Sequence, residues 1–443
     1  MNFNIPKKVD FIINTFYENG FEAFLVGGCI RDFLLGADPK DYDIATSATP
    51  EETISLFEKT IPTGLQHGTV TVLIDSESFE VTTYRTESEY KDNRHPEKVT
   101  FVKNIKEDLS RRDLTINAFA YNKKEGLIDF FNGMNDLNNK IIRCVGDSNL
   151  RFNEDALRML RAIRFSAKLN FKIEEKTLLS IEKNKDLIKN ISGERIRDEL
   201  CKILISDNSR LGLELLLKTG LLLNIIPEFK SSIEFNQYNH EEDIFNHTLS
   251  VIEKTPKVLN IRLAALFHAI GKPQTFTIDD KNVPHFYGYN IRSEEIARII
   301  LNRLRFDNKQ IKEVTTLIRE HLNTLDNPKS LNIKRLINRV SVDFIYNLYA
   351  LQKAKILSLS DSSVAIQKLE KMIFLTDEIL NSKQPLTIKD LDITGKDLII
   401  EFKVKPGKKI GEILSYLLDL VLDNEYLNKK ETLLFKAKEF LNE

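Results

Sequence analysis

The spacing of hydrophobic residues changes about one third of the way along the chain. Up to about residue 130, short apolar runs read as strands, at 23–26, 41–46, 69–74 and 79–85, with helical segments between them. From about residue 150 onward, apolar residues recur every three or four positions, which is the spacing of helices that bury one face. The sequence therefore predicts an α+β N-terminal part followed by an all-helical remainder.

Local signals predict individual turns and helix ends. Residues 75–78 lie between two alternating runs and predict a hairpin connection. Thr49-Pro50-Glu51-Glu52 combines an N-cap residue, a proline at the first helical position and a glutamate at the third, which predicts a helix start. In the helical remainder, breaks are predicted near 227–239, 284–290, Pro328, Pro385 and Pro406-Gly407.

Composition limits the class of protein. A chain of 443 residues exceeds the usual size of one hydrophobic core, so about two to four domains are expected. The 64 Lys and Arg residues nearly cancel the 65 Asp and Glu residues, so any nucleic-acid contact must come from a local basic patch. Cys29, Cys144 and Cys201 fit neither a disulfide framework nor a zinc cluster. With no apolar run of signal-peptide or membrane-span length, a soluble cytoplasmic protein is expected.

The first candidate for chemistry is a glycine turn followed by paired acids. Gly27 and Gly28 follow an apolar strand and lead into a helix; they let backbone N–H groups approach a triphosphate, and Arg31 adds a cation. Asp41 and Asp43 follow in a predicted strand, where residues two apart point to the same face and can hold divalent cations for phosphoryl transfer. A tight turn and a solvated strand edge are the alternatives, but the order of the two elements favours a nucleotide site.

A second candidate is the segment 108–118. Its adjacent arginines, Arg111 and Arg112, suit phosphate, and Asp113 suits a ribose hydroxyl. A capped surface helix is the alternative.

A third candidate is the charged run 154–164, which predicts one helix. Asp155 and Arg158 are three residues apart and so would be neighbours on it, while Arg161 and Arg164 continue a stripe that winds around the helix. A solvated helix face is the alternative for this run.

In this order and spacing, these segments resemble the motifs of the class II CCA-adding tRNA nucleotidyltransferases, of bacterial type, members of the polymerase β-like nucleotidyltransferase superfamily. Ser192-Gly193-Glu194-Arg195-Ile196 is similar to that family's fifth motif, and Pro406-Gly407-x-x-Ile410-Gly411 resembles its tail. The resemblance covers nearly the whole chain. It implies template-independent addition of CCA to the 3′ end of tRNA from CTP and ATP, with Mg²⁺ as cofactor and pyrophosphate as the second product.

The resemblance also implies a fold and its division. A polymerase β-like nucleotidyltransferase head with a mixed sheet would be followed by an all-helical neck, body and tail. The implied boundaries are 1–147 for the head, 148–206 for the neck, 207–385 for the body with a degenerate HD-like domain at about 240–330, and 386–443 for a tRNA-binding tail.

Specific roles follow from the same resemblance. Asp41 and Asp43 would bind magnesium and be catalytic, with Glu80 on a neighbouring strand as a further candidate carboxylate. Asp155 and Arg158 would read the base: cytosine and adenine both offer an amino donor beside a ring-nitrogen acceptor, which a carboxylate beside a guanidinium complements, whereas uracil and guanine offer a carbonyl there. The residues expected to bind the nucleotide are Gly28, Arg31, Arg112, Asp113, Asp155, Arg158, Arg161 and Arg164.

Basic residues outnumber the acids Asp147, Glu154 and Asp155 around the neck, which predicts the local positive patch that RNA binding needs. The patch comprises Lys140, Arg143, Arg151, Arg161, Arg164 and Lys168.

A different resemblance concerns residues 247–285, which are similar to an HD phosphohydrolase domain, where an adjacent His and Asp bind a metal. His247, His268 and His285 are present, but Ala269 stands at the Asp position and offers no ligand atom. We therefore expect a helical scaffold without metal-dependent hydrolysis, with a zinc site on the three histidines as the alternative.

Several functions stay open. The polar segment 85–96 resembles the flexible loop that the family associates with adding the terminal A, which does not separate full CCA addition from addition of A alone. Poly(A) polymerases share the head motifs. An HD-type phosphohydrolase conflicts with Ala269, and a non-catalytic RNA-binding protein would not need Asp41 and Asp43. The sequence does not indicate the oligomeric state.

Overall fold

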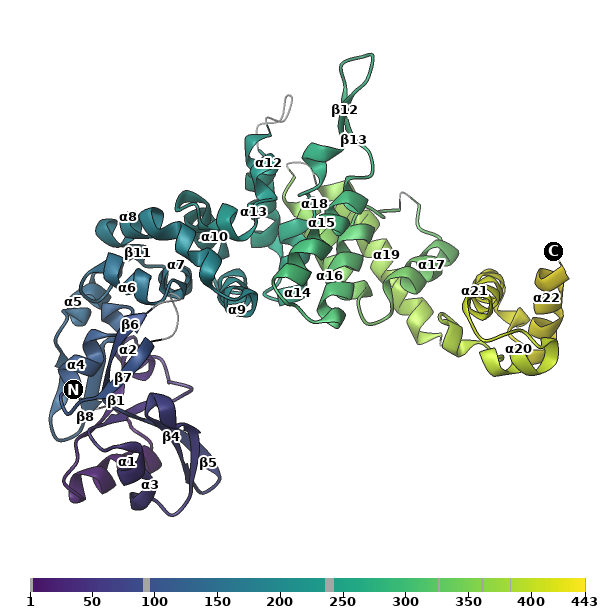
Figure 1. The fold of residues 1–443 in the computed structure, drawn as a ribbon. Coiled ribbons are helices and arrows are strands. Elements are labelled where there is room, and N and C mark those ends of the chain that lie inside the picture. The colour runs from purple at the N-terminus through teal and green to yellow at the C-terminus, as the bar shows by residue number, and fades with distance from the viewer. Residues whose placement is uncertain are drawn as a thin grey trace. The chain divides into compact units, whose positions relative to one another are not determined.

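Figure 1 shows the fold of the chain in a computed structural model, which describes residues 3–90, 96–235, 243–325, 327–359, 362–382 and 384–442. The chain divides into two compact units, one of residues 1–230 with 303–305 and the other of residues 231–302 with 306–443.

The first unit contains a mixed seven-stranded sheet in its described part, with strand order β3-β4-β5-β2-β1-β8-β9. Strand β2 pairs with β5 in parallel, and the other neighbours are antiparallel. The predicted α+β head with a mixed sheet is therefore confirmed. The strands are β1 (Ala23–Val26), β2 (Ile44–Thr46), β3 (Thr60–Gly64), β4 (Thr69–Ile74), β5 (Glu77–Thr83), β8 (Phe119–Asn122) and β9 (Gly126–Asp129).

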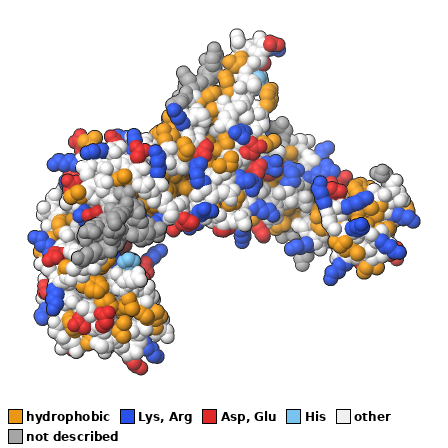
Figure 2. Space-filling view, viewed as in Figure 1, with side chains coloured by type: hydrophobic (Ala, Val, Ile, Leu, Met, Phe, Trp, Pro, Cys, Tyr) orange, Lys and Arg blue, Asp and Glu red, His pale blue; other side chains and the backbone are white. Residues whose placement is uncertain are grey.

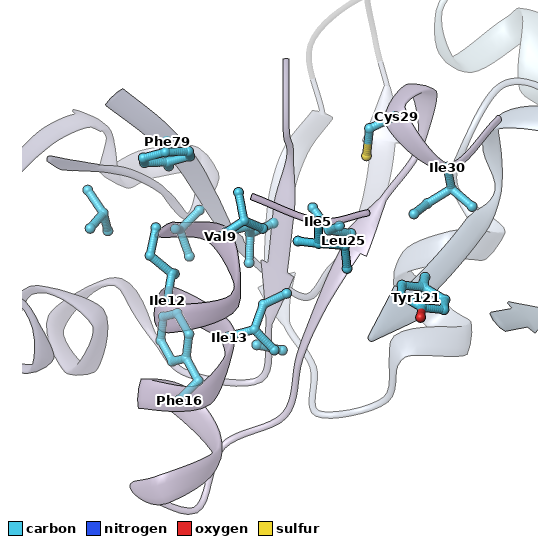
Figure 3. Close-up of a cluster of buried hydrophobic side chains, with 14 of the residues drawn as sticks. Ile5, Val9, Ile12, Ile13, Phe16, Leu25, Cys29, Ile30, Phe79 and Tyr121 are labelled. Carbon is cyan, nitrogen blue, oxygen red and sulfur yellow. The ribbon is translucent and has the colours of Figure 1, made fainter. Parts of the chain in front are cut away.

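Helix α1 (Lys7–Glu18) covers one face of this sheet because its apolar residues recur at i, i+3, i+4 and i+7. Figure 3 shows these four residues, Val9, Ile12, Ile13 and Phe16, in one buried cluster that also contains Leu25 of β1. All of them are buried, and full burial of one such side chain contributes roughly 1.5–3 kcal/mol. This core fixes the sheet whose strand ends carry the candidate site.

The other elements of the first unit join the sheet to a helical region in which α7 packs against α9 and α10. They are α2 (Gly28–Leu34), α3 (Pro50–Leu56), β6 (Arg85–Tyr90), β7 (Pro96–Phe101), α4 (Ile105–Ser110), α5 (Gly133–Asn138), β10 (Ile141–Ile142), α6 (Ser148–Glu154), α7 (Leu157–Leu169), β11 (Lys172–Ile173), α8 (Glu175–Asn184), α9 (Gly193–Leu204), α10 (Ser209–Lys218) and α11 (Leu221–Ile225), with α12 (Phe229–Glu234) at the unit boundary.

Two local predictions are confirmed. Asp75 and Ser76 form the tip of the β4–β5 hairpin with φ values of 47° and 68°, positive at both central positions as a type I′ turn requires. Helix α3 begins after Thr49, whose side chain accepts from the backbone N–H of Glu52 while the Glu52 carboxylate accepts from the backbone N–H of Thr49.

Two other predictions are wrong. Strand β2 begins at Ile44, so Asp41 and Asp43 lie before it and not within it. The run 154–164 is not one helix, because Asp155 is extended and its carboxylate accepts from the backbone N–H of Leu157 at 3.1 Å. This side-chain bond replaces the helical continuation, so α6 ends before Asp155 and α7 starts after it.

The second unit is helical in its described part apart from one antiparallel hairpin, β12–β13, which the sequence did not predict. Helix α13 packs against α14 and α18, and α14 packs against α16. As predicted, Pro328, Pro385 and Pro406 lie between helices. The elements are α13 (Ile244–Lys254), α14 (Leu259–Phe267), β12 (Phe276–Ile278), β13 (Pro284–Phe286), α15 (Tyr289–Arg303), α16 (Asn308–Glu320), α17 (Ser330–Val340), α18 (Ile345–Leu357), α19 (Ser363–Asn381), α20 (Gly395–Phe402), α21 (Lys408–Asp423) and α22 (Lys430–Asn442).

The surface carries charges of both signs. Figure 2 shows Lys and Arg side chains interspersed with Asp and Glu over the visible face, which agrees with the near-zero net charge. Over the residues that the structure describes, we find no helix with the length and hydrophobicity needed to span a bilayer.

Candidate functional site

Three predicted segments meet in one pocket of about 500 Å³ in the first unit. The pocket is lined by Gly27, Gly28, Arg31, Asp43, Arg111, Arg112, Asp113, Asn117, Asp155, Leu157, Arg158, Arg161, Arg164, Phe165, Lys168 and Arg195. All eight residues predicted to bind the nucleotide are among them. Because seven arginines and one lysine face three aspartates, the lining suits a polyanion.

The glycine turn is shaped by a close approach of an arginine. Gly27 has a φ of 78°, and a Cβ atom there would lie 2.8 Å from Nη1 of Arg112. A side chain at this position would therefore be strained and would displace the guanidinium. Gly28 starts α2, and a Cβ there would meet Arg31 only at an ordinary 3.6 Å, so Gly27 is the glycine that the geometry requires.

Arg31 is buried and held by hydrogen bonds. Its Nη1 donates to Oδ1 of Asn117 at 2.6 Å, and its Nη2 donates to Oδ1 of Asp32 at 2.6 Å. The Nδ2 of Asn117 in turn donates to Oδ1 of Asp113 at 3.3 Å. Asn117 thus links two predicted residues, and the sequence pointed to it only as part of the segment 108–118.

The Asp113 carboxylate is engaged on both oxygens. Oδ2 accepts from Nε of Arg161 at 2.6 Å, while Oδ1 accepts from the backbone N–H of Leu114 at 2.9 Å. Burial alone would raise the pKa of Asp113, but the Arg161 guanidinium and the hydrogen bond from Asn117 hold this pKa at about 2. The predicted contact with a ribose hydroxyl would have to share these oxygens.

Asp155 and Arg158 both line the pocket, but they are not paired with each other. Both carboxylate oxygens of Asp155 accept from Arg195, at 2.8 and 3.2 Å. The Arg158 guanidinium donates to Oε2 of Glu154 at 2.6 Å and to the backbone carbonyl of Arg111 at 2.9 Å. The expectation of neighbours on one helix is wrong because the helix breaks between them. Arg195 lies in the fifth motif and lines the pocket, but the sequence analysis assigned no role to it.

The predicted positive patch is partly neutralised by acids. Arg164 pairs with the buried carboxylate of Glu199 at 2.7 Å. Arg151 pairs with Glu154 at 2.7 Å, and Arg143 pairs with Asp136 at 3.0 Å. Within the pocket lining, Lys168 is exposed as a whole residue, but partial burial of its side chain, together with the charge of Arg31, lowers its pKa.

Acidic side chains line a second hollow of about 680 Å³, which Asp41, Asp43 and Glu80 share. Burial raises the pKa of Asp43, the Arg112 guanidinium partly offsets this, and the charges of Glu80 and Asp41 raise the pKa further. Carboxylates that repel each other in this way attract a divalent cation. In the described chain no three metal-ligating side chains are already grouped, but Mg²⁺ is commonly held by one or two carboxylates plus substrate phosphates, so these residues fit it.

The polar segment after β5 is a hairpin in its described part, where β6 pairs with β7. Residues 91–95 of the predicted loop lie outside the described residues. At the base of the hairpin, Glu87 pairs with Arg85 at 2.8 Å and with Arg111 at 3.1 Å. The hairpin base is thereby tied to a pocket-lining residue.

The histidines of the second unit are arranged differently from the prediction. The His268 ring contacts those of His247 and His321, with centroids 5.5 and 5.4 Å apart. His285 instead lies on β13, where it pairs with Asp279 at 3.0 Å. The third histidine is therefore His321, which the sequence comparison with HD domains did not include.

Cations surround this histidine cluster, which we define as His247, His268 and His321. The Tyr289 hydroxyl contacts Nε2 of His321 at 3.2 Å and accepts from Nζ of Lys355 at 3.2 Å. Burial, with the charge of Lys355 adding to it, lowers the pKa of His321 to about 3. Ala269 is fully buried and supplies no ligand atom, and the expectation of a scaffold stays a prediction.

Three families of known proteins match successive parts of the chain. Residues 23–143 match the poly(A) polymerase head domain, 170–233 match the RNA and SrmB-binding site of polymerase A, and 286–437 match tRNA nucleotidyltransferase domain 2. The CCA-adding enzyme of Ligilactobacillus salivarius is 36% identical in an alignment covering 99% of this chain and 98% of its own. That of Enterococcus faecalis is also 36% identical, over 98% of this chain and 95% of its own.

The fold agrees with these relatives. The crystal structure of the Bacillus stearothermophilus CCA-adding enzyme in complex with CTP superposes with a TM-score of 0.72 at 28% identity, covering 98% of both chains. Similarity in sequence and fold thus extends from end to end of the described chain, through the pocket and the acidic hollow. The chain therefore belongs to the family of CCA-adding enzymes, which are tRNA nucleotidyltransferases.

Proposed function

We propose that this chain adds C, C and A in turn to the 3′ end of tRNA, taking the nucleotides from CTP and ATP without a nucleic-acid template. The observation that carries the proposal is the position of Asp43, which lines both the arginine-rich pocket and the acidic hollow. A triphosphate bound by the arginines would therefore have its phosphates beside the carboxylates. This is the arrangement that phosphoryl transfer with divalent cations needs.

Asp41 and Asp43 are the proposed magnesium ligands, and Glu80 is available as a further carboxylate. Bound magnesium supplies charge stabilisation for the departing pyrophosphate and favours ionisation of the attacking hydroxyl. The bond from the terminal 3′ oxygen of tRNA to the α-phosphorus forms as the bond to the pyrophosphate oxygen breaks, and the hydroxyl proton passes to solvent.

The arginines of the pocket would bind the triphosphate. Asn117 holds the guanidinium of Arg31, Asp113 holds that of Arg161, and Glu199 holds that of Arg164. Each guanidinium therefore has a fixed orientation before a ligand binds. Arg112 lies over the Gly27 turn. Guanidinium groups fixed in this way stabilise negative charge without reorganising during the reaction.

We assign base selection to Asp155 and Arg158, and this role requires that each side chain exchange one of its present hydrogen bonds for one to the base. In this structure Asp155 is bound by Arg195, and Arg158 is bound by Glu154. An incoming cytosine or adenine would take over one hydrogen bond from each pair, with its amino group donating to Asp155 and its ring nitrogen accepting from Arg158. A uracil or guanine carbonyl would face the Asp155 carboxylate, so UTP and GTP would be disfavoured.

The location and the RNA-binding parts are also proposals. Cys29, Cys144 and Cys201 are free thiols, which supports the reducing cytoplasm as the compartment. The helical body and the tail, which begins near residue 386, are the parts proposed to hold tRNA.

The decisive experiment uses two tRNA transcripts, one ending at the discriminator base and one ending in CC. Each is incubated with every nucleoside triphosphate in labelled form, singly and as CTP with ATP. We expect the first transcript to gain CCA and the second to gain a single A. Extension of the CC transcript alone would indicate an A-adding enzyme, long A ladders would indicate a poly(A) polymerase, and no extension of either would contradict the proposal.

A further inference from the structure

Phe165 is a pocket residue that the proposed function leaves without a role. It lies on α7, is 5% exposed and lines the arginine-rich pocket. The guanidinium carbons of Arg164, Arg31 and Arg161 lie 4.2, 4.9 and 5.7 Å from the centroid of its ring. All three fall within the ~6 Å at which a cation is attracted to an aromatic ring.

The sequence places these groups together for a simple reason. Arg161, Arg164 and Phe165 are spaced i, i+3 and i+4 on α7 and therefore share one face of the helix. Arg31 reaches the same ring from α2, which is far away in the sequence.

Each of the three guanidinium groups also has a polar partner. Arg31 donates to Asn117, Arg161 pairs with Asp113, and Arg164 pairs with Glu199. A planar group held by an acceptor and by an aromatic ring loses most of its freedom to rotate. The ring also lies among three positive charges that repel one another, and its electron-rich face offsets part of that repulsion.

We infer that Phe165 is a positioning residue for nucleotide binding: its ring orients three arginines so that they are directed at the triphosphate before it arrives. The inference rests on the proposed function, because it takes a triphosphate to be the ligand of this pocket. Preorganised donors bind more tightly because the cost of ordering their side chains is met during folding.

The test removes the ring while keeping apolar bulk. The variants are Phe165→Leu, Phe165→Tyr, which retains the ring, and Phe171→Leu as a matched control. Phe171 is also 5% exposed and lies just after α7, but it does not line the pocket. Binding of inorganic triphosphate and of CTP is measured by calorimetry without tRNA, followed by kcat and KM for CTP with tRNA.

Phe165→Leu should weaken triphosphate binding and raise the KM for CTP about tenfold, the scale of three weak to moderate cation–π contacts. Its kcat should change by less than about threefold, and the Kd for tRNA should stay unchanged, because the ring acts through the arginines. Phe165→Tyr and Phe171→Leu should bind triphosphate within about threefold of the wild type.

The possible outcomes distinguish a failure of the inference about Phe165 from a failure of the proposed function. If Phe165→Leu binds triphosphate as the wild type does, or if Phe171→Leu is weakened as strongly, Phe165 is only a packing residue and the inference is overturned. If circular dichroism shows that Phe165→Leu is unfolded, Phe165→Met, whose unbranched chain fills the same space, is measured in its place. If the wild type binds neither inorganic triphosphate nor CTP, the proposed function fails instead.

Discussion

The acidic hollow of the first unit and the histidine cluster of the second were both candidates for metal binding from the sequence, yet their electrostatics are opposite. Burial raises the pKa of Asp43; the Arg112 guanidinium lowers this pKa, and the charges of Glu80 and Asp41 raise it. Burial lowers the pKa of His321, and the charges of Lys355 and Lys272 lower it further.

This difference shows that the sign of the neighbouring charges decides whether a cluster of potential ligands can bind a metal ion. A divalent cation in the hollow would relieve repulsion between carboxylates, whereas one beside the histidine cluster would meet two ammonium groups. Burial and the charge of Lys272 lower the pKa of Lys355 to about 8, so this lysine is still largely charged at neutral pH. We therefore expect the first site to attract a divalent metal ion and the second to repel one.

The strongest way to break the comparison is to remove the carboxylates. Asp41→Ala and Asp43→Ala should each lower the rate of nucleotide addition by about a thousandfold or more, because metal charge stabilisation contributes several kcal/mol and each ~1.4 kcal/mol is a factor of ten. Single-turnover addition of labelled CMP would measure this. Binding of tRNA, measured by filter retention, should survive, and a loss of rate below tenfold in both variants would contradict the assignment.

A smaller effect is expected from Asp155→Ala, which tests whether side chains choose the base. Selectivity for CTP and ATP over UTP and GTP should fall by about ten- to a hundredfold, because a hydrogen bond to a charged group contributes roughly 1.5–3 kcal/mol. Arg158→Ala should instead slow addition of C and A alike. Relative kcat/KM values for the four nucleotides on both tRNA transcripts would decide, and wild-type selectivity in Asp155→Ala would place base choice elsewhere.

The head shows how much of the structure could be predicted from the sequence. Strands, turns and caps of the head were predictable because they depend on neighbours in the chain, as at Thr49 and at the Asp75-Ser76 turn. The eight predicted pocket residues do meet, because three short segments with few alternatives carry them.

What the sequence could not give depends on partners distant in the chain. The partner of Asp155 is Arg195, forty residues later, and the helix break at Asp155 comes from its bond to the backbone of Leu157, which competes with a strongly helical pattern. His321, which follows the end of α16, joins the histidine cluster, whereas the nearer His285 lies in a hairpin that only its pairing with β12 reveals. Spacing alone contains no information of this kind.

The stability of the fold should depend on pH through His321 of the histidine cluster. Since the folded pKa of His321 is about 3 and its ordinary value is 6.5, the unfolded chain binds a proton between these pH values that the folded chain does not. Stability should therefore fall as pH falls from about 6.5 toward 3, by up to about 1.4 kcal/mol per pH unit for this group, which corresponds to about 3–6 °C in Tm for a unit of this size.

The groups facing His321 are His247, His268, Tyr289, Lys272 and Lys355. Because Lys355, whose pKa is about 8, stays protonated in this range, His321→Gln should reduce the slope of Tm against pH. A control, His67→Gln, alters an exposed histidine of the first unit and should keep the wild-type slope. Equal slopes in all three proteins would show that the cluster titrates as an ordinary exposed histidine does.

The smallest effect is expected from His268→Ala on nucleotide addition. His268 donates through Nδ1 to the backbone carbonyl of Ala265 at 2.7 Å, which leaves its buried Nε2 as an acceptor without a partner among the described residues. Such a nitrogen could ligate a metal, but Ala269 beside it offers no carboxylate and the nearby lysines oppose a cation.

The wild type should therefore show no phosphatase or cyclic-nucleotide hydrolase activity with manganese or nickel. His268→Ala should add nucleotides within about twofold of the wild-type rate, since it changes no pocket contact. Metal-stimulated hydrolysis that disappears in His268→Ala would show that the cluster is a second active centre, and the contrast with the acidic hollow would then be lost.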